Sequence, residues 1–229
     1  MRSYDEVARA ESERGELVLR RRSEEHAADV LELRVNGTYV MDTQETTSEV
    51  ELAARALELV ESPREVVVGG LGLGFTTQRV LADPRVVHVT VVEIEEALVR
   101  WMRDGTVPHG PALLADSRVR VVEADIVAAV AEATSTYDLV LLDVDNGPGQ
   151  LVHEQNGRIY ERAFLDSVRR IIAPGGALVV WSANAAPALA RDLERVFGDA
   201  AEHRCAVRLQ ERATEYFLYL ARAESACSS

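Results

Sequence analysis

Two aspartates stand where an apolar run of the sequence ends. In YDLVLLDVDNGPG, residues 137–149, the run stops at Asp143 and Asp145 and then turns at Asn-Gly-Pro-Gly. Residues two apart on a strand face the same side, so both carboxylates point one way if the strand still runs at Asp145. Two buried like charges are costly unless a cation or hydrogen-bond donors compensate them. Carboxylates here therefore predict a site that holds a cation or hydrogen-bond donors. Asp145 has an alternative, a turn formed with Asn146, whereas Asp143 is harder to explain as a turn residue.

A glycine-rich loop follows an earlier apolar run. The stretch VVVGGLGLGFT contains Gly69, Gly70, Gly72 and Gly74. Glycine lets the backbone turn tightly and approach a ligand without a Cβ in the way. Such loops also occur simply to turn a chain, but the position between a buried strand and a helix favours ligand binding.

Single acids end the next two predicted strands. Glu93 lies about 20 residues past the glycine loop, where a carboxylate can accept both hydroxyls of a ribose. Asp125 ends the third strand and can meet an adenine amino group, or it can cap the helix that follows. Glu95 and Glu96 are expected in the first turn of the helix after Glu93, where acids complement the helix dipole.

These acids and glycines together favour an adenosine with a cationic tail, which is S-adenosylmethionine or a relative. Acids around the pocket oppose a dinucleotide, because its pyrophosphate is anionic. The net charge of −13 opposes nucleic-acid binding. The chain contains no lysine, which excludes a Schiff base to pyridoxal phosphate and a Walker-type phosphate loop.

The elements that must position these residues alternate between strand and helix. Such alternation predicts an α/β fold with a parallel sheet covered on both faces. We expect strands at 65–70, 88–94, 119–125, 137–145 and 176–183, each followed by a helix. The last two predicted strands, 204–210 and 215–222, are too close for a helical crossover and must form an antiparallel hairpin. A parallel sheet that ends in such a hairpin is typical of the Rossmann-like class I methyltransferase fold.

The N-terminal part differs from the rest of the chain. Short strands are expected at 15–22 and 30–35, followed by a hairpin turn at Asn-Gly-Thr and a further strand. Apolar residues at helical spacing begin near Thr47, with Thr47 or Ser48 as the cap. We therefore predict a small β appendage over residues 1–46 and a nucleoside-binding catalytic domain over 47–229.

Two further features bear on the compartment. No apolar run approaches the ~20 residues that span a bilayer, and the charged N-terminus lacks the apolar core of a signal peptide, so we expect a cytoplasmic protein. Cys205 and Cys227 form no metal-like pair and are expected to be free thiols.

Over roughly residues 30–185, the sequence resembles the spermidine synthase family, the polyamine aminopropyltransferases. The resemblance implies a small N-terminal β domain before a methyltransferase-like domain. The family's Asp-Ser-x-Asp-Pro signature falls on DVDNGP, which would make Asp143 the residue that contacts the donor's amino group and helps deprotonate the attacking amine. The matched donor-binding positions are the loop Gly69 to Gly74, Glu93 for the ribose, and Asp125 with Ile126 beside the adenine.

The acceptor half departs from the family pattern. Gly72 stands where the family loop carries an Asp, and the family's Tyr-His-Glu reads Thr47-Ser48-Glu49, so only the acid is kept. A family Gln falls near Val40, a later Tyr falls on Leu165, and a Gln of the fifth strand falls near Trp181.

Several residues are candidates for the acceptor pocket. Glu49 and Asp145 can assist Asp143 or anchor a cationic acceptor. Tyr160 matches a family aromatic position or only packs, Trp181 lines the pocket or fills core, and His153 is a base or a solvated loop residue.

We therefore predict a transferase that uses decarboxylated S-adenosylmethionine, passes an aminopropyl group to a small amine and needs no metal. One alternative is a methyltransferase that uses intact S-adenosylmethionine. Others are a non-catalytic nucleoside-binding protein and a dehydrogenase that uses a nicotinamide dinucleotide. No nucleic-acid or membrane partner is expected, and an exposed β hairpin offers an edge for a homodimer.

Overall fold

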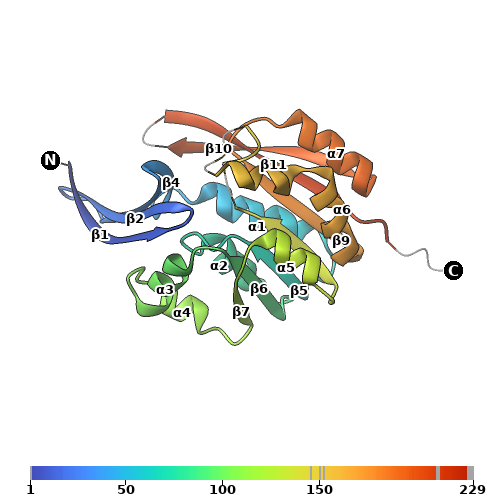
Figure 1. Cartoon of the computed structure of the whole chain (residues 1–229), viewed down its shortest axis with the longest axis horizontal. Coiled ribbons are helices and arrows are strands. Elements are labelled where there is room, and N and C mark those ends of the chain that lie inside the picture. Colours follow the sequence, from blue (N-terminus) through green and yellow to red (C-terminus); the bar gives the residue numbers. More distant parts are fainter. Residues whose placement is uncertain (1, 145, 150, 152, 210–211, 226–229) are drawn as a thin grey trace.

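The computed structural model of the chain has two β-sheets joined through α1 (Thr47–Leu59) (Figure 1). It describes residues 2–144, 146–149, 151, 153–209 and 212–225. The side chains of residues 209 and 212 lie outside this description. Within the described residues, no helix is long and apolar enough to cross a membrane.

The first sheet is antiparallel and has the strand order β1-β2-β3-β4. Its strands are β1 (Arg2–Ser12), β2 (Gly15–Glu24), β3 (Val30–Val35) and β4 (Thr38–Asp42). Asn36 and Gly37 have φ angles of 50° and 75° between β3 and β4, which confirms the predicted hairpin turn. Strand β1 was not predicted, because it is a mostly exposed edge strand whose charged sequence lacks an apolar face.

The second sheet has seven strands in the order β10-β11-β9-β8-β5-β6-β7. Five neighbouring strands are parallel. They are β5 (Glu65–Gly69), β6 (His88–Glu93), β7 (Val119–Glu123), β8 (Tyr137–Leu142) and β9 (Ile172–Ser182). The Val/Leu-rich sequences of β5, β6, β8 and β9 are mostly buried, whereas β7 lies at the sheet edge and is only partly buried. Strands β10 (Ala200–Leu209) and β11 (Arg212–Arg222) form the expected antiparallel hairpin, and β11 pairs antiparallel with β9.

Helices pack against both faces of this sheet. One face shares an apolar core with α1, α2 (Phe75–Leu81), α3 (Glu96–Asp104) and α4 (Gly110–Leu114), and this core continues into the N-terminal sheet. The other core contains α5 (Ile126–Glu132), α6 (Arg162–Ile171), α7 (Pro187–Phe197) and the 3₁₀ helix η1 (Glu154–Tyr160). The predicted class I methyltransferase-like fold is therefore confirmed.

Smaller differences from the sequence predictions are local. Helix α4 and the 3₁₀ helix η1 were not predicted, because both are too short for a clear periodic pattern. The predicted cap of α1 is wrong: Thr46 is the N-cap, and the Ser48 hydroxyl donates to Glu49 instead. The division of the chain into domains at residues 46 and 47 stays a prediction.

Candidate active site

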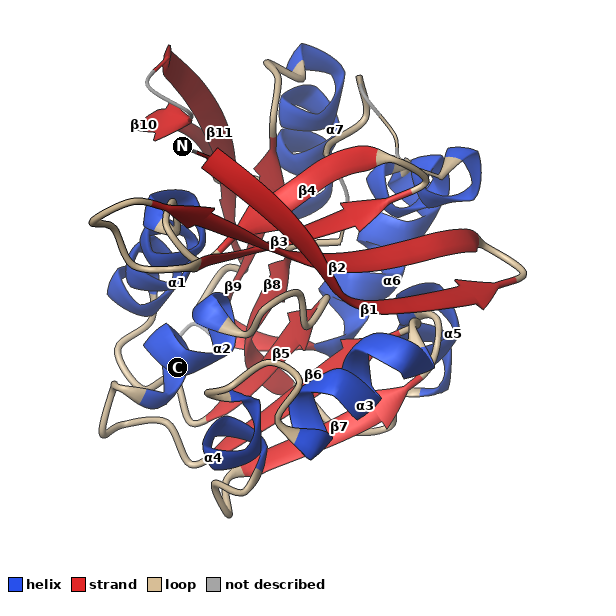
Figure 2. Ribbon diagram, turned by 90° about the vertical axis from the view of Figure 1, so that its left-hand side faces the viewer, coloured by secondary structure: helices blue, strands red, loops and turns tan. Residues whose placement is uncertain are grey.

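A pocket lies where the carboxyl ends of the parallel strands face the N-terminal sheet, which crosses in front of them in Figure 2. The main sheet supplies the glycine loop after β5 and the acids that follow β6, β7 and β8. The N-terminal sheet supplies an opposite, largely aliphatic wall. A pocket at this edge is where open α/β sheets bind their ligands.

The glycine loop brings backbone close to the end of β8. Gly70 has a φ of +90°, and a Cβ there would lie 2.1 Å from the carbonyl oxygen of Asp143. Gly72 has a φ of +51°, and a Cβ there would lie 2.8 Å from Met41 Sδ. Both glycines line the pocket, whereas Gly69 ends β5 and Gly74 is the N-cap of α2. Any side chain at Gly70 would collide with backbone that holds Asp143 in place.

Glu93, at the end of β6, is held by the backbone around it. Its Oε2 accepts from Leu71 N at 2.8 Å, and its Oε1 accepts from Glu95 N at 2.8 Å. Burial raises the pKa of Glu93, while these hydrogen bonds act in the opposite direction. Each carboxylate oxygen keeps a second lone pair, so Glu93 can still accept a ligand hydroxyl.

Asp125 combines the two roles that the sequence left open. Its Oδ1 accepts from Val127 N at 2.7 Å, so it caps α5. It also lines the pocket beside Ile126 and forms an ion pair with Arg158 of η1. This ion pair connects η1 to the N-terminus of α5, and the sequence analysis did not predict it.

Asp143 and Glu49 form the second acidic part of the pocket. Asp143 follows β8, and Thr76 Oγ1 donates to its Oδ2 at 2.8 Å. Burial raises the pKa of Asp143 to about 6, against this hydrogen bond. Burial and the charge of Asp143 raise the pKa of Glu49 to about 7. Carboxyls with pKa values in this range are suited to exchange protons near neutral pH.

The remaining predicted residues divide into three groups. His153 and Trp181 line the pocket, as does Asn146. Tyr160 is 7% exposed and belongs to the apolar core on the α6 side, so it is not among the described lining residues. Asp145 lies outside the described residues.

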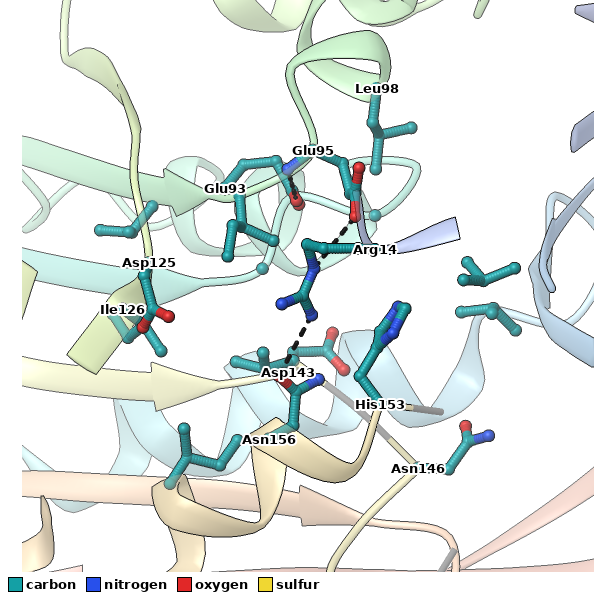
Figure 3. Close-up of a pocket in the computed structure, with 18 of the residues that line it drawn as sticks. Arg14, Glu93, Glu95, Leu98, Asp125, Ile126, Asp143, Asn146, His153 and Asn156 are labelled. Atoms are coloured by element: carbon teal, nitrogen blue, oxygen red, sulfur yellow. Dashed lines mark hydrogen bonds and ion pairs between the residues drawn. The ribbon is translucent and has the colours of Figure 1, made fainter. Parts of the chain in front are cut away.

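Arg14 is a pocket residue that sequence reasoning missed. It stands in the turn between β1 and β2, and its Nε donates to Glu95 Oε1 at 3.1 Å. Its Nη2 donates to Asn156 Oδ1 at 3.2 Å (Figure 3). Figure 3 shows the guanidinium crossing the pocket between Glu95 above and Asn156 below. Glu95 is thus a pocket residue as well as the N-cap of α3, which corrects the expectation that it serves only the helix.

The N-terminal sheet gives the pocket an aliphatic wall. These side chains are Leu17, Leu33, Val35, Val40 and Met41. Met41 is fixed against the glycine loop, because its sulfur accepts from Leu73 N at 3.2 Å. Within the part of the chain that the structure describes, no group of three His, Cys, Asp or Glu residues is placed to hold a metal ion.

Comparison with solved structures places this fold among known proteins. One match is a spermidine synthase in complex with the transition-state analogue AdoDATO, with a TM-score of 0.79 and 14% identity over 95% of this chain and 73% of that one. Another is the spermidine synthase of Thermotoga maritima, with a TM-score of 0.75 and 13% identity over 95% of this chain and 72% of that one. At such identities the matches establish the fold.

Sequence comparison finds relatives with two kinds of named activity. Polyamine aminopropyltransferase 2 of Pseudomonas aeruginosa is 28% identical over 158 residues, which are 64% of this chain and 43% of that protein. Putrescine N-methyltransferase 3 of Nicotiana tabacum is 30% identical over 122 residues, which are 52% of this chain and 30% of that protein. The matches thus span less than half the length of these relatives.

The family model of the spermine/spermidine synthase domain matches residues 45–198, which include α1, the glycine loop and every acid of the pocket described above. The match covers more than half of the chain and agrees with the shared fold. The chain therefore belongs to the spermine/spermidine synthase family.

Proposed function

We propose that this protein is an alkyl transferase that moves the aminopropyl group of decarboxylated S-adenosylmethionine to a small amine. The observation that carries the proposal is the placement of Asp143 and Glu49 in one pocket with the glycine loop, Glu93 and Asp125. The names of the aminopropyltransferase relatives and the fold shared with the AdoDATO complex support this choice of reaction.

The nucleoside half of the pocket fits the donor. Glu93 would accept the ribose hydroxyls, and Asp125 with Ile126 would contact the adenine. Gly70 lines the pocket, and because it has no Cβ its loop can pack directly against the backbone of Asp143. Asp143 would face the positively charged tail, because it follows β8 and its N–H donates to the carbonyl of Gly69 beside this loop.

The chain's contribution to the chemistry is to position the amine and to remove its proton. The donor supplies a sulfonium, which makes the attacked carbon electrophilic and gives a neutral thioether leaving group. As the amine lone pair forms the new C–N bond, the C–S bonding pair passes to sulfur, and Asp143 takes the proton from nitrogen. Glu49 would then share that proton, since the two carboxyls lie in one pocket and their charges interact.

Methyl transfer from intact S-adenosylmethionine is the second candidate, and one feature favours it. Gly72 lacks the loop acid that would hold the ammonium of a decarboxylated donor, and Met41 Sδ fills the adjoining space. The N-methyltransferase relatives are consistent with a family member that moves a methyl group.

Calorimetric titration with decarboxylated S-adenosylmethionine, intact S-adenosylmethionine and methylthioadenosine separates these possibilities. Tenfold or tighter binding of the decarboxylated donor, about 1.4 kcal/mol, is the expected result. The reverse preference would replace aminopropyl transfer by methyl transfer. Binding without turnover on any amine would favour a regulatory nucleoside-binding protein, and no binding of any of the three would end the donor assignment.

A cytoplasmic location and a homodimer belong to the same proposal. Sedimentation of the purified chain at several concentrations tests the dimer. A single species at the monomer mass, 25.2 kDa, would contradict it.

A further inference from the structure

The wall that faces Asp143 and Glu49 is aliphatic. The five side chains that the N-terminal sheet places along the pocket, between Leu17 and Met41, carry no charge. The Met41 sulfur, a weak acceptor, already accepts from Leu73 N. Leu17 and Leu33 are almost fully buried, at 1% and 2% exposure. This wall can cover methylene or ring surface of a ligand, and it offers nothing to compensate an ammonium.

Trp181 extends this wall from the main sheet. Its ring packs on Tyr216 with a centroid distance of 4.8 Å, and the residue is 9% exposed. Its Nε1 is buried and has no hydrogen-bond partner among the described residues. The indole N–H is a donor only, so it offers no hydrogen-bond acceptor to a second ammonium.

Most acids that line the pocket already have hydrogen-bond or ion-pair partners within the protein. Glu93 is held by two backbone N–H groups, Glu95 pairs with Arg14, and Asp125 pairs with Arg158. Three of the described lining carboxylates, Glu49, Glu93 and Asp143, have no cationic partner. Because two backbone N–H groups hold Glu93, where it would accept the ribose, Glu49 and Asp143 are the pair that would handle the reacting amine. The polar lining residues of the opposite wall, Asn146, His153 and Asn156, carry no negative charge.

We infer that the acceptor is an amine with a single cationic group and an apolar body, which lies between the N-terminal sheet and Trp181 with its nitrogen at Asp143 and Glu49. This inference rests on the proposed function and names its substrate class. A diamine or polyamine would have to bury its second ammonium against aliphatic side chains, which is costly without a paired charge.

A matched pair of amines tests this inference. Hexylamine and 1,6-diaminohexane share one chain length and differ in the second amine. Each is titrated into the protein saturated with methylthioadenosine, so that the readout is binding and needs no turnover. We expect hexylamine to bind at least about tenfold more tightly. Equal binding, tighter binding of the diamine, or no binding of either amine would overturn the inference.

The first step of the same experiment, the binding of methylthioadenosine, tests the proposed function separately from the acceptor class. If methylthioadenosine does not bind, the nucleoside site is wrong, and the acceptor inference falls with it. If methylthioadenosine binds and the diamine is preferred, only the acceptor class is wrong.

A substitution in the wall provides the converse test. Val40 is half-buried and lines the pocket, so it can accept a polar side chain at modest cost. Val40→Glu should raise the affinity for the diamine about tenfold, because the new carboxylate pairs with the second ammonium. Val40→Gln matches the size without the charge, so the difference in preference between the two variants measures the effect of the carboxylate alone. An unchanged preference in a folded Val40→Glu protein would contradict the inference. If this variant does not fold, the titration of the wild-type protein with the two amines remains the test.

Discussion

Arg14 Nε donates a hydrogen bond to Glu95 Oε1 at 3.1 Å, across 81 residues of sequence. Both side chains are mostly buried, with 17% and 11% of their surface exposed. The same guanidinium reaches Asn156 of η1, so one side chain of the N-terminal hairpin contacts two opposite walls of the pocket. This contact makes the N-terminal sheet part of the site.

Replacing Arg14 by alanine should weaken both the fold and the pocket. Glu95 would remain mostly buried without its partner, which is expected to cost about 1–3 kcal/mol of unfolding free energy. Methylthioadenosine affinity should fall about three- to tenfold, because η1 loses its tie to the hairpin. Arg9→Ala is the matched control, since Arg9 is exposed and pairs with exposed Glu6 and half-buried Glu16 on the same hairpin. Equal effects of the two substitutions on nucleoside affinity would argue against a role for Arg14 in the pocket.

Asp143→Asn should remove the proposed base. We expect kcat to fall by about 10²- to 10⁴-fold on the best amine acceptor, while methylthioadenosine, which has no cationic tail, binds as before. Burial raises the pKa of the Asp143 carboxyl to about 6. In the wild type, kcat should therefore rise with pH as this carboxyl loses its proton. Measured pH–rate profiles that show no acidic limb, together with an active Asp143→Asn protein, would exclude Asp143 as the base.

Thr76→Val should shift that acidic limb to higher pH. The Thr76 hydroxyl lowers the pKa of Asp143 by donating to the carboxylate, so its removal raises this pKa further. Thr77→Val is a close control, because the neighbouring Thr77 hydroxyl is buried without a hydrogen-bond partner among the described residues. Thr77→Val should leave the pH profile in place and keep or raise the melting temperature. Identical profiles for both variants would show that the Thr76 bond does not tune Asp143.

Glu49→Gln should stabilise the protein at pH 8 and have little effect at pH 5. The folded-state pKa of Glu49, about 7, exceeds its ordinary value of 4.5, so the folded chain binds this proton more tightly than the unfolded chain. Stability from this group is therefore present below pH 4.5 and is lost as the pH rises through 7. Gln carries no charge at either pH, so the variant should gain about 1–3 kcal/mol at pH 8. Thermal unfolding at the two pH values measures the difference, and a gain of the same size at both would refute the charge argument.

The parallel part of the fold is predictable because its strands are buried on both faces. Val66, Val67 and Val68 of β5 have neighbours above and below the sheet, so their sequence is continuously apolar and easy to recognise. Strand β1 leaves no such pattern, because most of its residues are exposed at a sheet edge. Its charged sequence alternates weakly, so the first strand of the β appendage was predicted only at residues 15–22.

The site shows the same division between local and long-range information. Glu93, Asp125 and Asp143 follow strands of a parallel sheet, so topology alone brings them to one edge. Arg14 has no local signal, since only the tertiary position of the N-terminal hairpin brings it to the pocket. Tyr160 ends a 3₁₀ helix, and the sequence does not determine that its ring packs toward α6.

The long reach of Arg14 also sets an order of events during synthesis. The hairpin that carries Arg14 is made before its partner Asn156, which follows 142 residues later in the sequence. At translation rates of about 5–20 residues per second, this interval lasts roughly 7–28 s. The aliphatic face of the N-terminal sheet packs against helices that are also made later, so this face stays exposed to solvent until they have been synthesised. Chaperones that recognise exposed aliphatic strands would meet β1 to β4, residues 2–42, before any of the lining acids of the pocket has been translated.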